Sequence, residues 1–197
     1  MFKRTLLILS GLIIFPVLVS AYVSPGKPTG FINDFASVLK AETKVQLEEK
    51  LSNFSRETGN EVSVAIISSL GDETIETYAV KLFEEWGIGK AKEDNGLLLL
   101  VSIEDKELRI EVGYGLEPII TDLESSRIIR EVIVPEFKKG NYDAGITNGV
   151  DRIISDITNG SAPSESPKQM PNISTFFYPA IFLIIFFASI LGRSKSW

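Results

Sequence analysis

The sequence predicts an α/β domain in which a small mixed β-sheet is sandwiched between helices (α/β/α). Residues 61–68 and 97–103 form apolar runs typical of buried strands, and an amphipathic helical pattern at 74–86 separates them. A strand–helix–strand unit places its two strands parallel in one sheet. Residues 108–112 follow after a short turn and add an antiparallel neighbour. Helical patterns on both sides of this unit supply the covering layers.

Two helices are predicted ahead of the central strand 97–103. The first spans 42–58 and ends before Gly59. Its apolar face comprises Leu47, Leu51 and Phe54. The second spans 74–86, and its apolar residues recur at helical intervals. These are Ile75, Tyr78, Ala79, Leu82, Phe83 and Trp86.

Two further helices are predicted after the hairpin. Thr121 and Glu124 have the spacing of a capping box, which satisfies the free amides at the start of a helix. The helix that they open carries Ile128, Ile129, Val132 and Ile133. Asn141 follows Gly140 and is predicted to cap a last helix. The apolar residues of that helix are Ile146, Val150, Ile153, Ile154 and Ile157.

The hairpin predicts which loops meet at one end of the sheet. If Ile103 pairs with Leu108 across the turn, Leu97 faces Tyr114, because each step along one strand moves one step back along the other. The same register places Asp94 near Glu117. The Asp-Asn-Gly and Gly-Tyr-Gly-Leu-Glu segments that begin at Asp94 and Gly113 would then share one end of the sheet.

Three carboxylates are therefore expected near this sheet end, namely those of Asp94, Glu117 and Asp122. Oxygen ligands without His or Cys suit a hard cation, with Ca²⁺ favoured and Mg²⁺ as the second choice. Gly113 and Gly115 would let a backbone group approach a ligand closely. The alternative is structural, because Asp-Asn-Gly is a common turn and Asp122 suits the first turn of a helix.

The composition excludes several kinds of site. The chain contains neither Cys nor His, so disulfides, thiolate nucleophiles, Ser-His-Asp triads and His-ligated zinc are absent. Four of the 20 basic residues lie at the chain ends and all 26 acidic residues lie between them, which gives the middle a formal charge of −10. Such a domain repels phosphate backbones, so nucleic acid is not an expected partner.

The two ends predict export and membrane anchoring. Residues 1–21 have a basic start, an apolar stretch and small residues before a cleavage point, as in a signal peptide. Residues 173–192 are 20 uncharged residues, long enough to span a bilayer as a helix. The alternatives are an uncleaved N-terminal anchor and a buried core helix, respectively.

The flanks of the second apolar segment set the expected orientation. Residues 193–197 carry Arg193 and Lys195, which mark the cytoplasmic side. Residues 159–172 are rich in Pro and Ser and predict a solvated linker. The folded domain, 22–158, is thus expected outside the cytoplasm, periplasmic or extracellular, on a single-pass anchor in the cell membrane.

Several short motifs, taken together and in order, resemble the TPM domain family. They are Phe-Ile-Asn-Asp-Phe-Ala-Ser at 31–37, Trp-Gly-Ile-Gly at 86–89, Asp-Asn-Gly with its apolar strand at 94–101, Val-Gly-Tyr-Gly-Leu-Glu at 112–117, and Thr-Asp at 121–122. The resemblance covers about residues 29–157. It implies an α/β sandwich, acidic residues that can bind a divalent cation, and a phosphatase activity found in some members. It also relates the chain to bacterial membrane-anchored proteins and to thylakoid-lumen proteins of photosystem II repair.

The resemblance extends the candidate metal site to four residues. Asp34, Asp94 and Asp122 correspond to recurring aspartates of the family, and Glu117 to the acid that follows its Gly-x-Gly. Asn33 and Asp34 can also be explained as an Asx turn.

Two functions follow as hypotheses. The first is an accessory module that binds membrane or envelope proteins during their assembly or turnover. The second is a divalent-metal-dependent acid phosphatase outside the cytoplasm, in which Arg109 or Arg127 would hold the phosphate.

Overall fold

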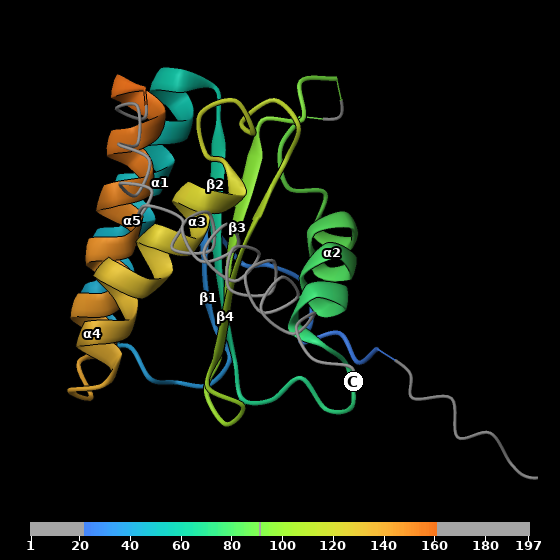
Figure 1. The fold of residues 1–197 in the computed structure, drawn as a ribbon, viewed down its shortest axis with the longest axis vertical. Helices are drawn as coiled ribbons and strands as arrows, with labels where there is room; N and C mark the ends of the chain where they lie inside the picture. The colour runs from blue at the N-terminus through green and yellow to red at the C-terminus, as the bar shows by residue number, and fades with distance from the viewer. Residues whose placement is uncertain (1–21, 91, 161–197) are drawn as a thin grey trace, which may run out of the picture. The chain divides into compact units, whose positions relative to one another are not determined.

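A computed structural model describes residues 22–90 and 92–160 of the chain. Four strands form one sheet in the order β1 (Ile32–Asp34), β2 (Glu61–Ile67), β3 (Gly96–Ser102) and β4 (Glu107–Val112). The first three strands are parallel and β4 is antiparallel to β3 (Figure 1). The mixed sheet and its parallel central pair are as the sequence predicts.

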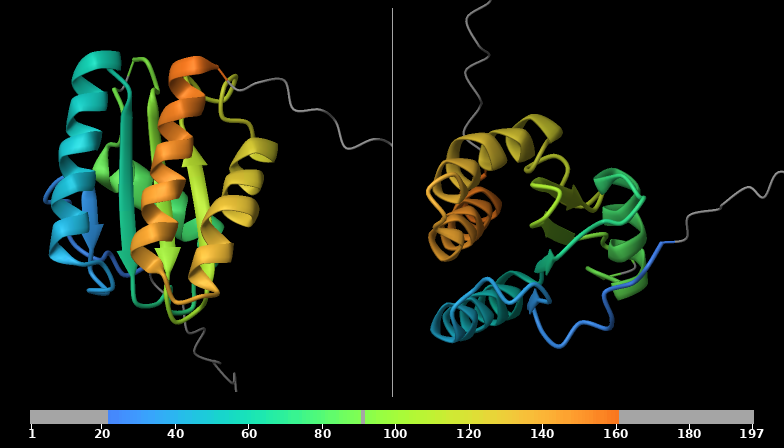
Figure 2. Two further views of the ribbon diagram at one scale, coloured as in Figure 1. Left: turned by 90° about the vertical axis from the view of Figure 1, so that its left-hand side faces the viewer. Right: turned by 90° about the horizontal axis from the view of Figure 1, so that it is seen from below.

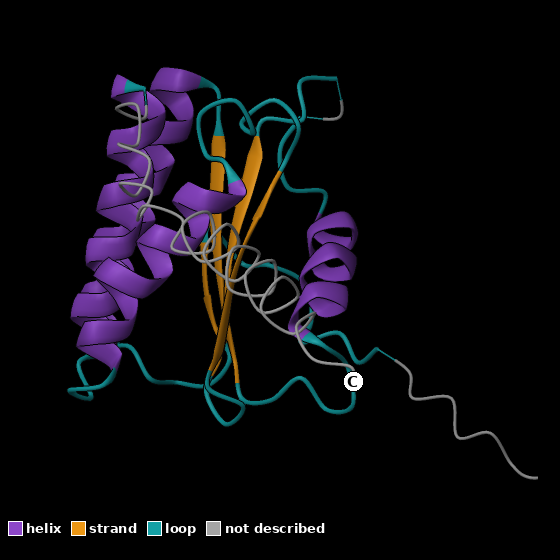
Figure 3. Cartoon of the chain, in the orientation of Figure 1, coloured by secondary structure: helices purple, strands orange, loops and turns teal. Residues whose placement is uncertain are grey.

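Helices cover both faces of this sheet. They are α1 (Ala41–Thr58), α2 (Ile75–Trp86), α3 (Asp122–Arg127), the π-helix η1 (Ile128–Ile133), α4 (Val134–Phe137) and α5 (Tyr142–Asn159). α2 lies alone on one face, and α1, α5 and the α3–α4 segment lie on the other (Figures 2 and 3). The predicted sandwich of a small mixed sheet between helices is confirmed.

The core consists of two apolar layers, one on each face of the sheet. Val64 and Leu99 belong to the layer that packs on α1 and α5, whereas Ala65 and Leu98 belong to the layer under α2. Every residue of β3 is buried, so both faces of this strand contribute. Full burial of one aliphatic side chain stabilises a fold by roughly 1.5–3 kcal/mol, which explains the continuous apolar run.

The ends of the helices agree with the sequence in most respects. Gly59 ends α1 in the left-handed conformation, and the Thr74 hydroxyl caps α2 by accepting from the Thr77 amide. The prediction that Asn141 caps α5 is wrong in its chemistry. Asn141 stands at the N-cap position, but its side chain makes no cap bond and instead donates to Glu136.

Strand β1 is absent from the elements that the sequence predicts. It has only three residues, too few for a periodicity to show. Asp34 pairs with Ile66 of β2, so it ends a strand. The side chain of Asn33 still closes a local turn, because its amide nitrogen Nδ2 donates to the Gly30 carbonyl oxygen at 2.8 Å.

The register of the β3–β4 hairpin differs from the predicted one by two residues. Leu108 pairs with Val101 where Ile103 was expected, and Leu97 pairs with Val112 where Tyr114 was expected. The turn has the four residues assumed, but they are 103–106 and not 104–107, because Ser102 pairs with Glu107 and Ile103 lies outside the ladder. A shift of two residues keeps each side chain on its expected face, so the pattern of burial does not reveal it.

The residues that follow the predicted cleavage point are ordered against α2. The indole nitrogen of Trp86 donates to the Gly26 carbonyl oxygen at 2.9 Å, and the Tyr78 hydroxyl donates to that of Val23 at 3.0 Å. Burial raises the pKa of Tyr78 to about 12.

The predicted signal peptide 1–21, the membrane span 173–192 and the tail 193–197 lie outside the described residues. Within 22–90 and 92–160, no helix has the length and apolar character needed to cross a bilayer. The first residue of the predicted linker, Asn159, is the last residue of α5.

Candidate functional site

The loop after β4 is held against the segment that precedes β3. The amide of Gly113 donates to the Gly96 carbonyl oxygen at 2.9 Å, and the amide of Gly115 donates to that of Asp94 at 3.0 Å. The Leu116 amide then bonds back to the Gly113 carbonyl oxygen at 2.9 Å. Backbone bonds thus fix three residues of a five-residue loop, 113–117.

Both glycines of this loop are required by contact between two backbones. A β-carbon at Gly113 would overlap the carbonyl oxygen of Asp94, and one at Gly115 would overlap that of Glu93. The facing atoms are main chain, which cannot rotate away as the end of a side chain can. The Gly-x-Gly spacing therefore lets the two segments lie directly against each other.

Tyr114, between the two glycines, projects into solvent. Its side chain is 77% exposed, although the backbone on either side is hydrogen-bonded. Leu123, in the first turn of α3, is 50% exposed. Exposed aromatic residues on a fixed backbone lose little conformational entropy on binding, which makes them effective contact residues.

Three of the four predicted metal ligands belong to this part of the molecule. Asp94, Glu117 and Asp122 are all exposed, on the segment before β3, the 113–117 loop and the start of α3, respectively. Because of the changed register, Asp94 lies opposite Gly115 and not opposite Glu117. Asp94 has a φ of 45°, a left-handed conformation that Asp tolerates better than most residues.

Asp34 lies at the other end of the sheet. It pairs with Ile66, which pairs with Val101, five residues along β3 from Gly96. At about 3.3 Å per residue, roughly 16 Å separate this level from the start of β3. Asp34 therefore cannot share one ion with Asp94, contrary to the four-residue site that the resemblance implies.

The Asp34 carboxylate instead holds the chain between β1 and α1. Its side chain has no exposed surface and accepts from the amides of Val38 at 3.2 Å and Leu39 at 3.0 Å. The ammonium nitrogen of Lys44 lies 3.9 Å from the Oδ2 of Asp34. Within 22–90 and 92–160, no three Asp, Glu, His or Cys side chains gather closely enough to hold a metal ion.

Both arginines considered as phosphate ligands donate to a carboxylate of their own strand or helix. Arg109 Nε donates to Glu111 at 2.7 Å, within β4. Arg127 donates to Glu124 at 3.1 Å, within α3. Each guanidinium is thus engaged by a carboxylate.

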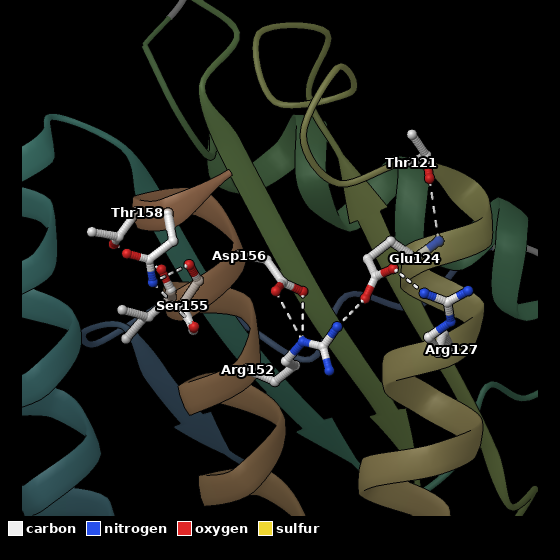
Figure 4. Close-up of polar contacts among 9 residues, drawn as sticks. Thr121, Glu124, Arg127, Arg152, Ser155, Asp156 and Thr158 are labelled. Carbon is white, nitrogen blue, oxygen red and sulfur yellow. Dashed lines mark hydrogen bonds and ion pairs between the residues drawn. The ribbon is translucent and has the colours of Figure 1, made fainter. Parts of the chain in front are cut away.

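A buried ionic network on α3 and α5 was not predicted from the sequence. Glu124 is 3% exposed. Its Oε2 accepts from Arg127, and its Oε1 accepts from Arg152 at 2.6 Å (Figure 4). The same guanidinium binds both oxygens of Asp156, at 2.9 and 2.8 Å. This hydrogen-bonded carboxylate raises the pKa of Arg152.

The spacing of residues in the sequence could have indicated part of this network. The capping box was predicted at Thr121 and Glu124, and the Thr121 hydroxyl does accept from the Glu124 amide at 3.2 Å. The Glu124 carboxylate, however, turns to the arginines. Arg152 and Asp156 are four residues apart, the spacing of an ion pair on one helix face.

Comparison with known proteins identifies the domain. The family model of the TPM domain matches residues 32–156. The solution NMR structure of the N-terminal domain of a protein from P. gingivalis is 31% identical to this chain, covers 68% of this chain and 87% of its own, and has a TM-score of 0.61. Comparison with curated proteins gave no match.

Two more distant structures show the same fold. The BA42 protein of the psychrophilic bacterium Bizionia argentinensis is 20% identical, with a TM-score of 0.54 over 66% of this chain and 90% of its own. The N-terminal domain of a Corynebacterium glutamicum protein is 14% identical, with a TM-score of 0.53 over 75% of this chain and 93% of its own. From the family match and the 31% identity, the chain belongs to the TPM domain family.

Proposed function

We propose that this protein is a membrane-anchored binding module that holds a membrane or envelope protein outside the cytoplasm during assembly or turnover. The observation that carries the proposal is Tyr114, 77% exposed on a loop whose backbone is fixed on both sides. Protein interfaces concentrate their binding energy in a few such aromatic residues, with values of about 2 kcal/mol or more for each.

The charge around Tyr114 indicates the chemistry of the partner. Asp94, Glu117 and Asp122 are exposed in neighbouring segments of the same part of the fold. A complementary partner presents an apolar pocket for the tyrosine ring within a rim of Lys or Arg. Anionic lipid headgroups and nucleic acids would instead be repelled.

The expected topology is consistent with such a role. A span at 173–192 and a linker that ends at 172 would confine the domain to the membrane surface. Confinement raises the effective concentration of the domain towards other membrane proteins, so a weak contact suffices.

The alternative, a divalent-metal-dependent acid phosphatase, has less support in the geometry. It needs a cation, ligands on one side of that cation and a cationic group for the phosphate. Asp34 lies about 16 Å along the sheet from the start of β3. Arg109 and Arg127 are each engaged by a glutamate. Any cation would have to be held by Asp94, Glu117 and Asp122 without Asp34.

Site-specific crosslinking tests the binding proposal. A photo-reactive phenylalanine analogue replaces Tyr114 in the full chain, expressed at its native level, and crosslinked products are identified by mass spectrometry. The matched control carries the analogue at Val45, which is 68% exposed on α1. We expect one defined membrane or envelope protein to be crosslinked from position 114 and not from position 45.

The identified partner is then titrated with the purified full chain. Tyr114→Ala is expected to weaken binding by roughly 30-fold, the equivalent of about 2 kcal/mol, and Val45→Ala to leave it unchanged. Equal crosslinking from both positions, or no product from position 114, would contradict the proposal.

A further inference from the structure

A second site lies at the opposite end of the sheet from Tyr114. It is a cavity of about 400 Å³ beside the last residues of β3, between the β3–β4 turn and the α4–α5 segment. Cavities of roughly 300–1,000 Å³ are the usual size for small-molecule sites. In sheets with parallel strands such sites occur at the carboxyl ends of the strands, which is where this one lies. Its lining residues are Val101, Ser102, Ile103, Lys106, Leu108, Val134, Phe137, Lys138 and Tyr142.

The walls of the cavity are apolar and firmly placed. Phe137 and Tyr142 pack edge to face, with ring centroids 4.9 Å apart and planes at 66°. Gly145 of α5 allows this arrangement, because a β-carbon there would overlap the Phe137 ring. Ile103 and Leu108 pack against the main core from the other side. The cavity is thus a preformed apolar space.

The charged groups that line this space are both cations. Lys106 and Lys138 are exposed, and no carboxylate is among the lining residues that the structure describes. Neither lysine forms an ion pair within the described residues. This is notable in a segment with a formal charge of −10.

Two nearby acids, Asp105 and Glu136, are held by other partners. Glu104 and Glu107, exposed in the same turn as Lys106, form no ion pair with it in the part of the chain that the structure describes. Asp105 accepts from the Ser102 hydroxyl at 2.6 Å and from the Leu70 amide at 2.7 Å. Glu136 accepts from Lys139 at 2.7 Å and from Asn141 at 3.3 Å. Two ammonium groups are therefore left to face an external anion.

We propose that this cavity binds a small organic carboxylate with an apolar body. The body would fill the space beside Phe137 and Tyr142, and the carboxylate would lie at the mouth between Lys106 and Lys138. Phosphate sites more often use the two-pronged guanidinium of Arg, and no Arg is among the described lining residues. The site is independent of the Tyr114 surface, so either proposal can fail without the other.

Methyl NMR on the full chain in nanodiscs of zwitterionic lipid tests this proposal. The methyl signals of Ile103, Leu108 and Val134 are followed during titration with 3-phenylpropanoate. We expect saturable shifts with a Kd below roughly 1 mM. Acetate, which has the charge alone, and 3-phenyl-1-propanol, which has the body alone, should each bind at least roughly tenfold more weakly.

Two double variants identify the charged groups. Lys106→Gln with Lys138→Gln should weaken 3-phenylpropanoate binding at least roughly tenfold, while Lys27→Gln with Lys92→Gln, at exposed lysines outside the cavity, should not. No saturable shift, equal binding of the alcohol, or an unchanged Kd in the first variant would overturn the proposal. Tighter binding of phenyl phosphate than of 3-phenylpropanoate would overturn its choice of carboxylate.

Discussion

The guanidinium of Arg152 in α5 lies 2.6 Å from a carboxylate oxygen of Glu124 in α3 (Figure 4). The same guanidinium binds Asp156, so one cation pairs with two buried carboxylates. Glu124 also accepts from Arg127 at 3.1 Å. The network therefore joins the segment that follows the 113–117 loop to the last helix of the domain.

Arg152→Met is expected to destabilise the domain by about 2–3 kcal/mol, because it leaves Glu124 and Asp156 buried with less compensation. The figure is below the roughly 3–5 kcal/mol of a fully buried pair, since the Arg152 side chain is 41% exposed. Urea unfolding measures the change. Arg130→Met is the matched control, because the Arg130–Glu131 pair is exposed on both sides, and it should cost under about 0.5 kcal/mol. Equal losses in the two variants would contradict a special role for the network.

Gly113→Ala is expected to destabilise more than Gly71→Ala. The added β-carbon at Gly113 meets the backbone of Asp94, which has to move. At Gly71 there is open space, and only the positive φ of 66° opposes the substitution, at about 1 kcal/mol. Thermal unfolding of both variants measures the difference. A Gly113→Ala variant as stable as Gly71→Ala would show that the two segments are not in close contact.

Periodicity was sufficient to predict most of the fold. The long helices follow from repeats of 3.6 residues, as in α2, and the buried strands follow from continuous apolar runs, as in the seven residues of β3. Strand β1 was missed because three residues show no period, and its place in the sheet depends on pairing with β2. The hairpin register was missed because a shift of two leaves every side chain on the same face.

The candidate site could be predicted only in part, for a related reason. The proximity of Asp94 to the 113–117 loop follows from the hairpin alone. The position of Asp34 depends on which end of β1 meets which end of β3, and a family motif does not state this. The Lys106–Lys138 cavity joins a turn and a helix end 32 residues apart, and no local pattern links them.

Acid should destabilise the domain partly through Asp105. Hydrogen bonds from the Ser102 hydroxyl and then the Leu70 amide lower the pKa of this carboxyl below 3.8, its ordinary value. A lowered folded pKa means that the contribution is fully present above about pH 4 to 5 and is lost as the pH falls through the folded value. Asp105→Asn should therefore flatten the fall in unfolding free energy between about pH 5 and pH 2.

The control for that experiment is Asp151→Asn. Asp151, on α5, is exposed and pairs with Lys50 on α1. Its effect on the slope should be smaller. Urea unfolding at a series of pH values gives both slopes. An Asp105→Asn variant with the slope of the unmodified chain would show that this carboxyl does not contribute.

The effect of calcium on the melting temperature should distinguish Asp94 and Asp34, which lie at opposite ends of the sheet. Asp94, Glu117 and Asp122 do not gather closely enough among the described residues to hold an ion as they stand, so a cation would have to draw them together. Binding would then offset their mutual repulsion, and a hundredfold excess over Kd would stabilise the fold by about 2.7 kcal/mol. Millimolar Ca²⁺ should then raise the melting temperature of the full chain by several degrees, and Asp94→Asn should remove most of the rise.

Asp34→Asn should behave differently. It should lower the melting temperature without calcium, because the amides of Val38 and Leu39 lose a charged acceptor. The calcium-dependent rise should survive, since Asp34 lies at the other end of the sheet. A rise that Asp34→Asn abolishes would contradict this placement, and no rise with Ca²⁺ or Mg²⁺ would leave the three exposed carboxylates as turn residues, caps and contacts for a basic partner.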